Sequence, residues 1–159
     1  MAYLHGEAPS GGSAAGCIFC ELPAQQRDAE NLIVHRGQLA FVILNRYPYN
    51  NGHLMVVPYQ HVATLEALAA PTLAEIMLLA KQALTALRGM YAPQAFNLGI
   101  NIGTAAGAGI ADHVHMHVVP RWAGDSNFMT TVADTRVIPE DLRDTYRSAV
   151  AHWPADGAA

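Results

Sequence analysis

Charge, cysteine and long apolar runs are all scarce in this 159-residue sequence. Charged residues make up only 14% of the chain, with no run of basic residues and no basic stripe interleaved with aromatic side chains. Such stripes are typical of nucleic-acid-binding surfaces, so we expect no nucleic-acid partner. No stretch approaches the roughly 18 consecutive apolar residues of a membrane-spanning helix, so we expect no membrane association.

The two cysteines suggest chemistry rather than a disulfide framework. Cys17 and Cys20 stand in a CxxC arrangement. The N-terminus lacks the basic segment followed by an apolar core that a secretory signal requires, which predicts a cytoplasmic protein. In a reducing compartment, the CxxC spacing favours a metal-binding or redox pair over a structural disulfide.

Apolar residues are abundant, at 52% of the chain, which is enough for one large core. Residues 1–16 are small, rich in glycine and without periodicity, so we expect a flexible segment there and a single domain over 17–159. The formal net charge of −4 provides no global field for anions. An anionic ligand would therefore have to be held by local groups.

Hydrophobic periodicity predicts a strand-rich fold with two main helices. A short turn or single helical turn should carry the two cysteines, and a hairpin should form around Gly37. A long helix is predicted to begin at Pro71 and to end near Gly89, and Pro139 should open a final helix over about 140–152. Strands are predicted within 31–37, 38–45, 53–58, 94–103 and 113–120. This order predicts an α+β fold with a meandering antiparallel sheet of about five strands.

Three histidines, His113, His115 and His117, alternate with apolar residues in the last predicted strand. Side chains on a strand alternate between faces, so the three imidazoles should line one face. Such a row can supply a nucleophile and a proton donor near neutral pH, with the middle histidine best placed to attack phosphorus. Ligation of one metal by all three is an alternative, but the row would span roughly 13 Å, too wide without a bulge. A solvated edge strand is the third interpretation.

A glycine-rich loop precedes the histidines. Gly103, Gly107 and Gly109 would let backbone amides converge on an anion without side-chain obstruction. An ordinary flexible turn between two strands is the alternative. The loop is therefore weak evidence by itself for a phosphate site.

These motifs together resemble the histidine triad superfamily of nucleotide hydrolases and transferases. The stretch HVHMHVVPR matches its alternating signature, and the likeness extends to CIFC, AFVILNRYPYNNGHLMVVP, FNLGINIG and PRWAGDSNF. The last stretch is most similar to the branch that contains bacterial diadenosine tetraphosphate phosphorylases and related dinucleoside polyphosphate hydrolases. The resemblance implies the HIT-like fold over nearly the whole domain.

The resemblance also implies roles for four histidines. His115 would be the nucleophile that forms a nucleotidyl-histidine intermediate, and His117 would contact the α-phosphate. His53 would complete the catalytic cluster with the first triad residue, His113. Three other histidines, His5, His35 and His152, are interpreted as surface residues and receive no role.

Substrate-binding residues follow from the same resemblance. Asn45 matches an asparagine that relatives use against ribose hydroxyls, although a turn residue before Pro48 is an equal alternative. Ala108 and Gly109 stand where many relatives carry a serine, threonine or glutamine, so backbone amides would have to act alone. Trp122 could stack on adenine or be a half-exposed core aromatic, and Arg121 is the nearest guanidinium for a distal phosphate. The implied substrate-binding set is Asn45, Asn101, Gly107, Ala108, Gly109 and Trp122.

A second set of residues predicts a zinc site. CxxC with two distant histidines gives a Cys2His2 set suited to tetrahedral zinc, and some triad-family members use this arrangement. The set here is Cys17, Cys20, His61 and His113. With four protein ligands the metal would be structural; buried thiols or a weak redox couple are the alternatives.

The resemblance implies an enzyme that cleaves dinucleoside polyphosphates, diadenosine tetraphosphate above all, through a nucleotidyl-histidine intermediate. Either phosphate or water could complete the reaction, giving phosphorolysis or hydrolysis. The alternatives are a hydrolase of other nucleotide phosphoesters or phosphoramidates, and a non-catalytic nucleotide-binding protein. Relatives commonly form homodimers that extend the sheet across subunits, so we expect a homodimer or a larger homo-oligomer.

Overall fold

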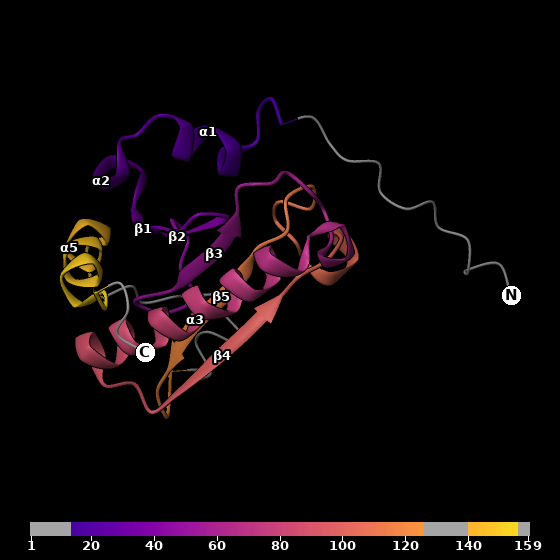
Figure 1. The fold of residues 1–159 in the computed structure, drawn as a ribbon. Coiled ribbons are helices and arrows are strands. Elements are labelled where there is room, and N and C mark those ends of the chain that lie inside the picture. The colour runs from indigo at the N-terminus through magenta and orange to yellow at the C-terminus, as the bar shows by residue number, and fades with distance from the viewer. Residues whose placement is uncertain (1–13, 126–139, 156–159) are drawn as a thin grey trace, which may run out of the picture.

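A computed structural model of the chain describes residues 14–125 and 140–155, and shows one antiparallel sheet with helices on both of its faces (Figure 1). The predicted α+β fold with five strands is confirmed. The strands are β1 Ile33–Arg36, β2 Ala40–Leu44, β3 Leu54–Pro58, β4 Ala95–Ile100 and β5 Met116–Arg121. The helices are α1 Ile18–Ala24, α2 Asp28–Asn31, α3 Ala70–Tyr91 and α5 Leu142–His152, with 3₁₀ turns at Leu65–Ala67 and Thr104–Ala106.

The sheet has the order β1-β2-β3-β5-β4, so it departs from a simple meander at one point. β1 and β2 are joined by a short turn, the hairpin predicted around Gly37, and a longer loop over residues 45–53 joins β2 to β3. Helix α3 then carries the chain to β4 at the sheet edge, and β5 returns between β3 and β4. This return places the triad strand beside β3, the strand that follows His53.

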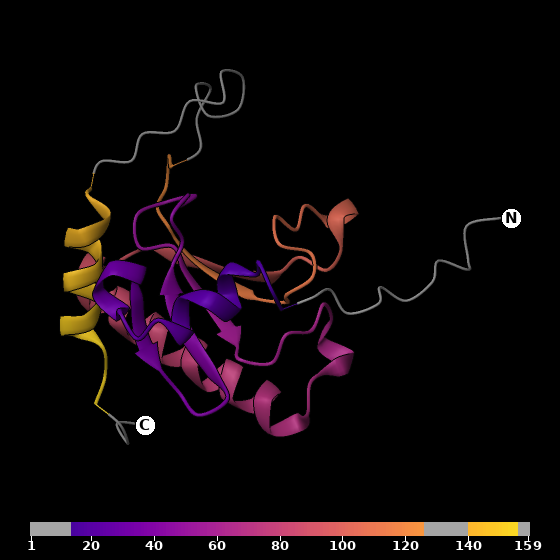
Figure 2. The ribbon, with the colours of Figure 1, turned by 90° about the horizontal axis from the view of Figure 1, so that it is seen from above.

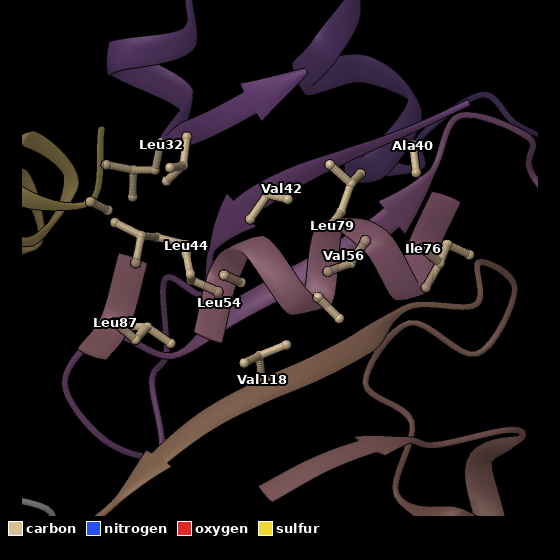
Figure 3. Packing of buried hydrophobic residues seen from close by; sticks show 14 of the residues in the cluster. Leu32, Ala40, Val42, Leu44, Leu54, Val56, Ile76, Leu79, Leu87 and Val118 are labelled. Carbon is tan, nitrogen blue, oxygen red and sulfur yellow. The ribbon is translucent and has the colours of Figure 1, made fainter. Parts of the chain in front are cut away.

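The two faces of the sheet bury different halves of the alternating strand sequences. On one face Val42, Val56 and Val118 pack under α3 (Figure 3). On the other face Phe41 and Met55 pack with α1, on the opposite side of the sheet from α3 (Figure 1). The prediction that the second strand is covered on both faces is confirmed, since all five residues of β2 are buried.

Helix α3 is longer than predicted. It begins at Ala70, so Pro71 lies at its second position, where the missing N–H has no acceptor to lose. It continues past Gly89 and ends at Tyr91, and the next residue, Ala92, adopts the left-handed conformation. Ile76, Leu79 and Leu87 face the sheet and are at most 3% exposed. The periodic apolar face is therefore what joins α3 to the sheet.

Three other elements differ in extent from the prediction. β5 begins at Met116, so only His117 of the triad lies within a hydrogen-bonded strand; the backbone before it instead pairs through Val114 N–H with Val62 O at 2.7 Å. The cysteine segment forms the two-turn helix α1 instead of a single turn. Helix α5 begins at Leu142, and the Asp141 side chain caps it by accepting from Arg143 N–H at 2.8 Å. Pro139, the predicted start, lies outside the described residues.

Helix α5 packs against α3 and β1 at one end of the sheet (Figure 2). Most of the predicted flexible segment, residues 1–13, lies outside the described residues. Within the described ranges 14–125 and 140–155, no helix is long and apolar enough to cross a membrane.

Candidate active site and metal cluster

The sheet brings His117 and His53 together. In the register of β3 and β5, His117 lies opposite Met55, and His53 precedes Met55 by two residues, so both imidazoles project from the same face. Their rings meet with 2.9 Å between His53 Nε2 and His117 Nδ1. His53 has no exposed surface, which makes this contact a fixed part of the fold.

His115 is oriented by its own backbone neighbourhood. Its Nδ1 lies 2.8 Å from the carbonyl oxygen of His113, which can only accept, so Nδ1 carries the proton. The other ring nitrogen, Nε2, then carries a lone pair. The Phe19 ring lies 4.9 Å from the His115 ring and holds it in place, and His115 is only 5% exposed. This is the arrangement that a neutral nitrogen nucleophile requires.

A chain of hydrogen bonds assigns the tautomers of the other two histidines. Asn45 Oδ1 accepts from the backbone N–H of Tyr47 at 2.9 Å, which turns the Asn45 amide nitrogen toward His53 Nδ1 at 3.3 Å. The backbone N–H of Tyr49 also donates to His53 Nδ1, at 3.1 Å. Two donors there leave Nδ1 unprotonated, so His53 Nε2–H donates to His117 Nδ1. His117 must then carry its proton on Nε2.

The site keeps its imidazoles neutral. Burial lowers the pKa of His115, and the hydrogen bond to the His113 carbonyl opposes this only in part. Burial, together with the neighbouring His115, lowers the pKa of His117 from 6.5 to about 4. Burial likewise lowers the pKa of His113. Near neutral pH the site therefore presents a free lone pair at His115 and a neutral N–H at His117.

A cavity of about 630 Å³ opens in front of His115 and His117, within the range of small-molecule pockets. At its polar end lie the two histidines with Asn101, Gly107 and Gly109. The rest of the lining is mostly apolar and comes from α1, from Leu32 before β1 and from the end of β2, with Asn31, Asn45 and Arg46 as its polar residues. Apolar lining residues there are Ile18, Phe19, Leu22, Leu32, Ile43 and Leu44.

The glycine loop offers fewer free amides than predicted. Gly107 N–H donates to Thr104 O at 3.0 Å and Ala108 N–H to Gly103 O at 3.4 Å, so both are used within the loop. Ala108 is also absent from the cavity lining, whereas Gly107 and Gly109 line it. Among the described residues, Gly109 N–H donates to none, which leaves it for a ligand.

The structure does not bring Trp122 to the histidines. Trp122 follows β5 on the face of the sheet opposite His117, and its ring lies 6.2 Å from Tyr91 of α3. It is absent from the cavity lining. Arg121, the candidate for a distal phosphate, forms two 2.7 Å hydrogen bonds with Asp125. The half-exposed aromatic interpretation of Trp122 therefore fits this chain better than stacking on a base.

Two aromatic residues of the site received no role from the sequence. Phe19 stands between the two cysteines and contacts both His113 and His115, at 5.5 and 4.9 Å. Tyr49 lies 4.7 Å from His53 and 5.9 Å from His117 and lines the cavity. The only signal for Phe19 in the sequence was its position within CIFC. The helical turn that carries the two cysteines also directs the Phe19 ring toward the triad.

The four predicted metal ligands converge. Their ligand atoms all lie within 4.8 Å of one another, although they come from α1, the segment after β3 and the segment before β5. Cys17 Sγ and His61 Nδ1 each lie 3.3 Å from His113 Nδ1. Cys20 Sγ lies 3.4 Å from His61 Nδ1 and 3.6 Å from His113 Nδ1. These residues form a group that could hold a metal ion.

The spacing and protonation of the group fit tetrahedral zinc. Bonds of about 2.05 Å to nitrogen and 2.3 Å to sulfur place ligand atoms about 3.3 to 3.8 Å apart, which matches the four individual distances of 3.3 to 3.6 Å above. His113 Nε2–H donates to Pro58 O at 2.8 Å, so its Nδ1 is the ligating nitrogen. Burial and the neighbouring Cys17 raise the pKa of Cys20 to about 11, which a divalent cation would reverse.

The alternative in which all three triad histidines bind one metal is not supported. His113 turns to the two cysteines and His61, whereas His115 and His117 face the cavity. Within the part of the chain that the structure describes, the group of ligand atoms includes neither of these two. The triad is therefore divided between two adjacent sites.

Comparisons with known proteins place the chain among histidine triad proteins. The family model described as the HIT domain matches residues 26–124. The chain is 46% identical to the AP-4-A phosphorylase of Mycobacterium tuberculosis (strain H37Rv) over 145 residues, covering 91% of this chain and 74% of that protein. A Zn-bound histidine triad family protein from Mycobacterium smegmatis superposes with a TM-score of 0.72 at 27% identity, covering 89% of this chain and 95% of that chain. A hypothetical histidine triad nucleotide-binding protein from Sulfolobus tokodaii gives a TM-score of 0.66 at 26% identity, with coverage of 85% and 92%.

Proposed function

This chain belongs to the HIT domain family, and from that premise we propose that it is an enzyme that cleaves dinucleoside polyphosphates at His115. Diadenosine tetraphosphate is the proposed substrate, in agreement with the name of the mycobacterial relative, AP-4-A phosphorylase. The observation that carries the proposal is the protonation of His115: Nδ1–H is held by the His113 carbonyl, so Nε2 presents a lone pair to the cavity.

In the first step, His115 Nε2 attacks the α-phosphorus. A P–N bond forms and the bond from the α-phosphorus to the bridging oxygen breaks, so the electron pair leaves with the rest of the polyphosphate. His117 Nε2–H donates to the phosphoryl group, because His53 holds the proton on that nitrogen. The departing group from diadenosine tetraphosphate would be ATP.

In the second step, an oxygen of phosphate or of water attacks the same phosphorus and the P–N bond breaks. The electron pair returns to His115 Nε2, which restores the starting enzyme. Phosphate as the acceptor gives ADP, and water gives AMP. Both routes use the same nucleophile.

The cavity also suggests where the nucleotide binds. We assign the phosphates to the polar end, near Asn101 and the Gly109 amide, and the base to the apolar end, since phosphates need donors and a base needs apolar contact. Asn45 lies between the two ends, as a ribose contact would require. Its amide already binds Tyr47 and His53, so it would also couple ribose binding to the catalytic histidines.

We further propose that Cys17, Cys20, His61 and His113 bind structural zinc. With four protein ligands, no open position remains for a metal-bound water. The metal would join α1 to the segment before β5 and thereby fix the His113 carbonyl, which orients His115. Cytoplasmic localisation remains our prediction and agrees with two free thiols.

The homodimer also remains a proposal. β4 is an edge strand with exposed residues, including Leu98 at 41%. On α3, Met77 and Leu78 are 55% and 60% exposed. An edge strand is suited to pairing with a second copy, and exposed apolar residues of a helix are a second surface that such an assembly could cover.

The test uses diadenosine tetraphosphate labelled in its α-phosphates. Wild-type enzyme quenched in denaturant should carry label bound to protein, and the His115→Ala variant should carry none. His152→Ala, which changes an exposed histidine outside the cavity, serves as the control and should behave as wild type. Product analysis with and without phosphate then separates ADP from AMP. Undiminished cleavage by His115→Ala would refute the proposal.

Two other functions give different results in the same experiment. A hydrolase of other nucleotide phosphoesters or phosphoramidates would leave diadenosine tetraphosphate intact but cleave those esters through the same labelled histidine. A non-catalytic protein would bind nucleotide tightly without turnover of any substrate. The nucleophile-like protonation of His115 favours the enzymes over the binding protein.

A further inference from the structure

Asn31 is a polar side chain at the apolar end of the cavity. It ends α2, lines the cavity beside Leu22 and Leu32, and is only 7% exposed. Its distance from the triad follows from α1: Phe19 contacts His115, whereas Asn31 binds Leu22, which lies about one helical turn further along the helix. Asn31 is therefore placed where the base of a bound nucleotide would lie.

The orientation of its amide group is fixed by two hydrogen bonds. Asn31 Nδ2 donates to Leu22 O at 2.9 Å and to Gln25 Oε1 at 3.1 Å. Because a backbone carbonyl can only accept, the nitrogen must face Leu22 and the oxygen must face away. The amide is thus held rigidly, without help from a ligand.

Asn31 Oδ1 is left as an acceptor. Among the residues that the structure describes, no donor reaches this oxygen, and it is not one of the buried atoms without a partner. The oxygen is consequently accessible, and Asn31 lines the cavity. A fixed acceptor without a protein partner, in a cavity lined mostly by apolar residues with Asn45 and Arg46 among the polar ones, favours a ligand with a donor at that point.

We propose that Asn31 selects the base: its Oδ1 accepts a hydrogen bond from the exocyclic amine of adenine. The inference rests on the proposed nucleotide site. Hypoxanthine carries an oxygen where adenine carries this amine, so two acceptors would face each other. Unsubstituted purine has neither group, so it loses the hydrogen bond without gaining the repulsion.

The test compares three dinucleoside tetraphosphates, with adenine, unsubstituted purine or hypoxanthine at both ends. For wild-type enzyme, kcat/KM should be about 3- to 12-fold higher for adenine than for purine, the range of one net hydrogen bond. Hypoxanthine should be the poorest substrate. A wild-type enzyme that turns over adenine and purine equally would overturn the proposal, and this comparison needs no variant.

The variant Asn31→Ala separates recognition from structure. It should lower kcat/KM for adenine to the value for purine, so that their ratio approaches one. It should also raise kcat/KM for hypoxanthine relative to that for purine, because the repulsion between the two acceptors is removed. A purely structural role, tying α2 to α1, would lower all three equally and keep the ratio, which would overturn the proposal. Glu30→Ala, an exposed neighbour on α2, should retain wild-type ratios.

A failure of the proposed function is distinguishable from a failure of this inference. If none of the three substrates is cleaved, the catalytic proposal fails, and selectivity is measured by calorimetric binding of AMP, purine riboside monophosphate and IMP. AMP should then bind about 3- to 12-fold more tightly than the purine compound, with the difference lost in Asn31→Ala. Equal binding of AMP and the purine compound would overturn the role of Asn31.

Discussion

The hydrogen bond from His53 to His117 can be tested by a pair of substitutions that each keep one half of it. His53 uses Nδ1 to accept from Tyr49 N–H and Nε2 to donate to His117. In His53→Asn, the amide oxygen can take the place of Nδ1 but no donor reaches His117. In His53→Gln, the amide nitrogen can take the place of Nε2 but the acceptor for Tyr49 N–H and for the Asn45 amide is lost. We expect the two variants to differ in activity.

The expected magnitudes follow from the burial of His53, which has no exposed surface. Each variant removes part-buried hydrogen bonds of His53, so each should lower the free energy of unfolding by about 1 to 3 kcal/mol. Only His53→Asn removes the donor to His117 Nδ1, so in this variant the proton of His117 can lie on either ring nitrogen. We expect its kcat for diadenosine tetraphosphate to fall about 10- to 100-fold, and that of His53→Gln to stay within about 3-fold of wild type.

The assay combines product chromatography with urea denaturation and ¹⁵N NMR of the imidazoles. Denaturation identifies conditions in which both variants are folded, so that stability does not affect the comparison of rates. NMR reports directly which nitrogen of His117 carries the proton, whatever the substrate. Equal losses in the two variants, or a greater loss in His53→Gln, would refute the assignment of the proton by His53.

Three further predictions concern metal, pH and the end of β5. Cys20→Ser should lower the zinc content and reduce the Tm by roughly 5 °C or more, and chelation of the wild type should have the same effects. Elemental analysis measures the zinc and thermal unfolding measures the Tm. An unchanged Tm on metal loss would contradict a structural zinc site. The pKa of His117 is about 4 in the folded chain and 6.5 in the unfolded chain. Between these pH values only the unfolded chain binds the proton, so the free energy of unfolding should decrease as the pH falls from about 6.5 to about 4. In urea titrations, His117→Gln should flatten this dependence. Asp125 accepts hydrogen bonds from Arg121, from Trp122 N–H and from the Asn50 side chain. Asp125→Asn should therefore lower the free energy of unfolding by about 1.5 to 3 kcal/mol in urea titrations, while the zinc content stays at the wild-type value. An unchanged urea midpoint would show that these contacts do not contribute to stability.

Local sequence patterns were sufficient for the fold class and for part of each cluster of chemical groups, and the family resemblance supplied His53 and His61. Periods of two and of three to four residues predicted five strands and the long helix, because side-chain direction repeats regularly in each element. The side chains of His113, His115 and His117 still lie on the opposite side of the backbone from Val114 and Met116, although β5 begins only at Met116. The CxxC pair likewise identified half of the metal cluster, since two thiols spaced this way lie within one helical turn.

The tertiary structure alone decided how these groups are used. The proton positions on His53 and His117 depend on Tyr49 N–H and on the register of β3 with β5, which joins residues 64 positions apart. The same non-local packing turned Trp122 away from the cavity and placed Asn31 in its wall. A sequence pattern repeats along one element and so determines which face a side chain occupies. Which groups meet across elements depends on packing that no single segment encodes.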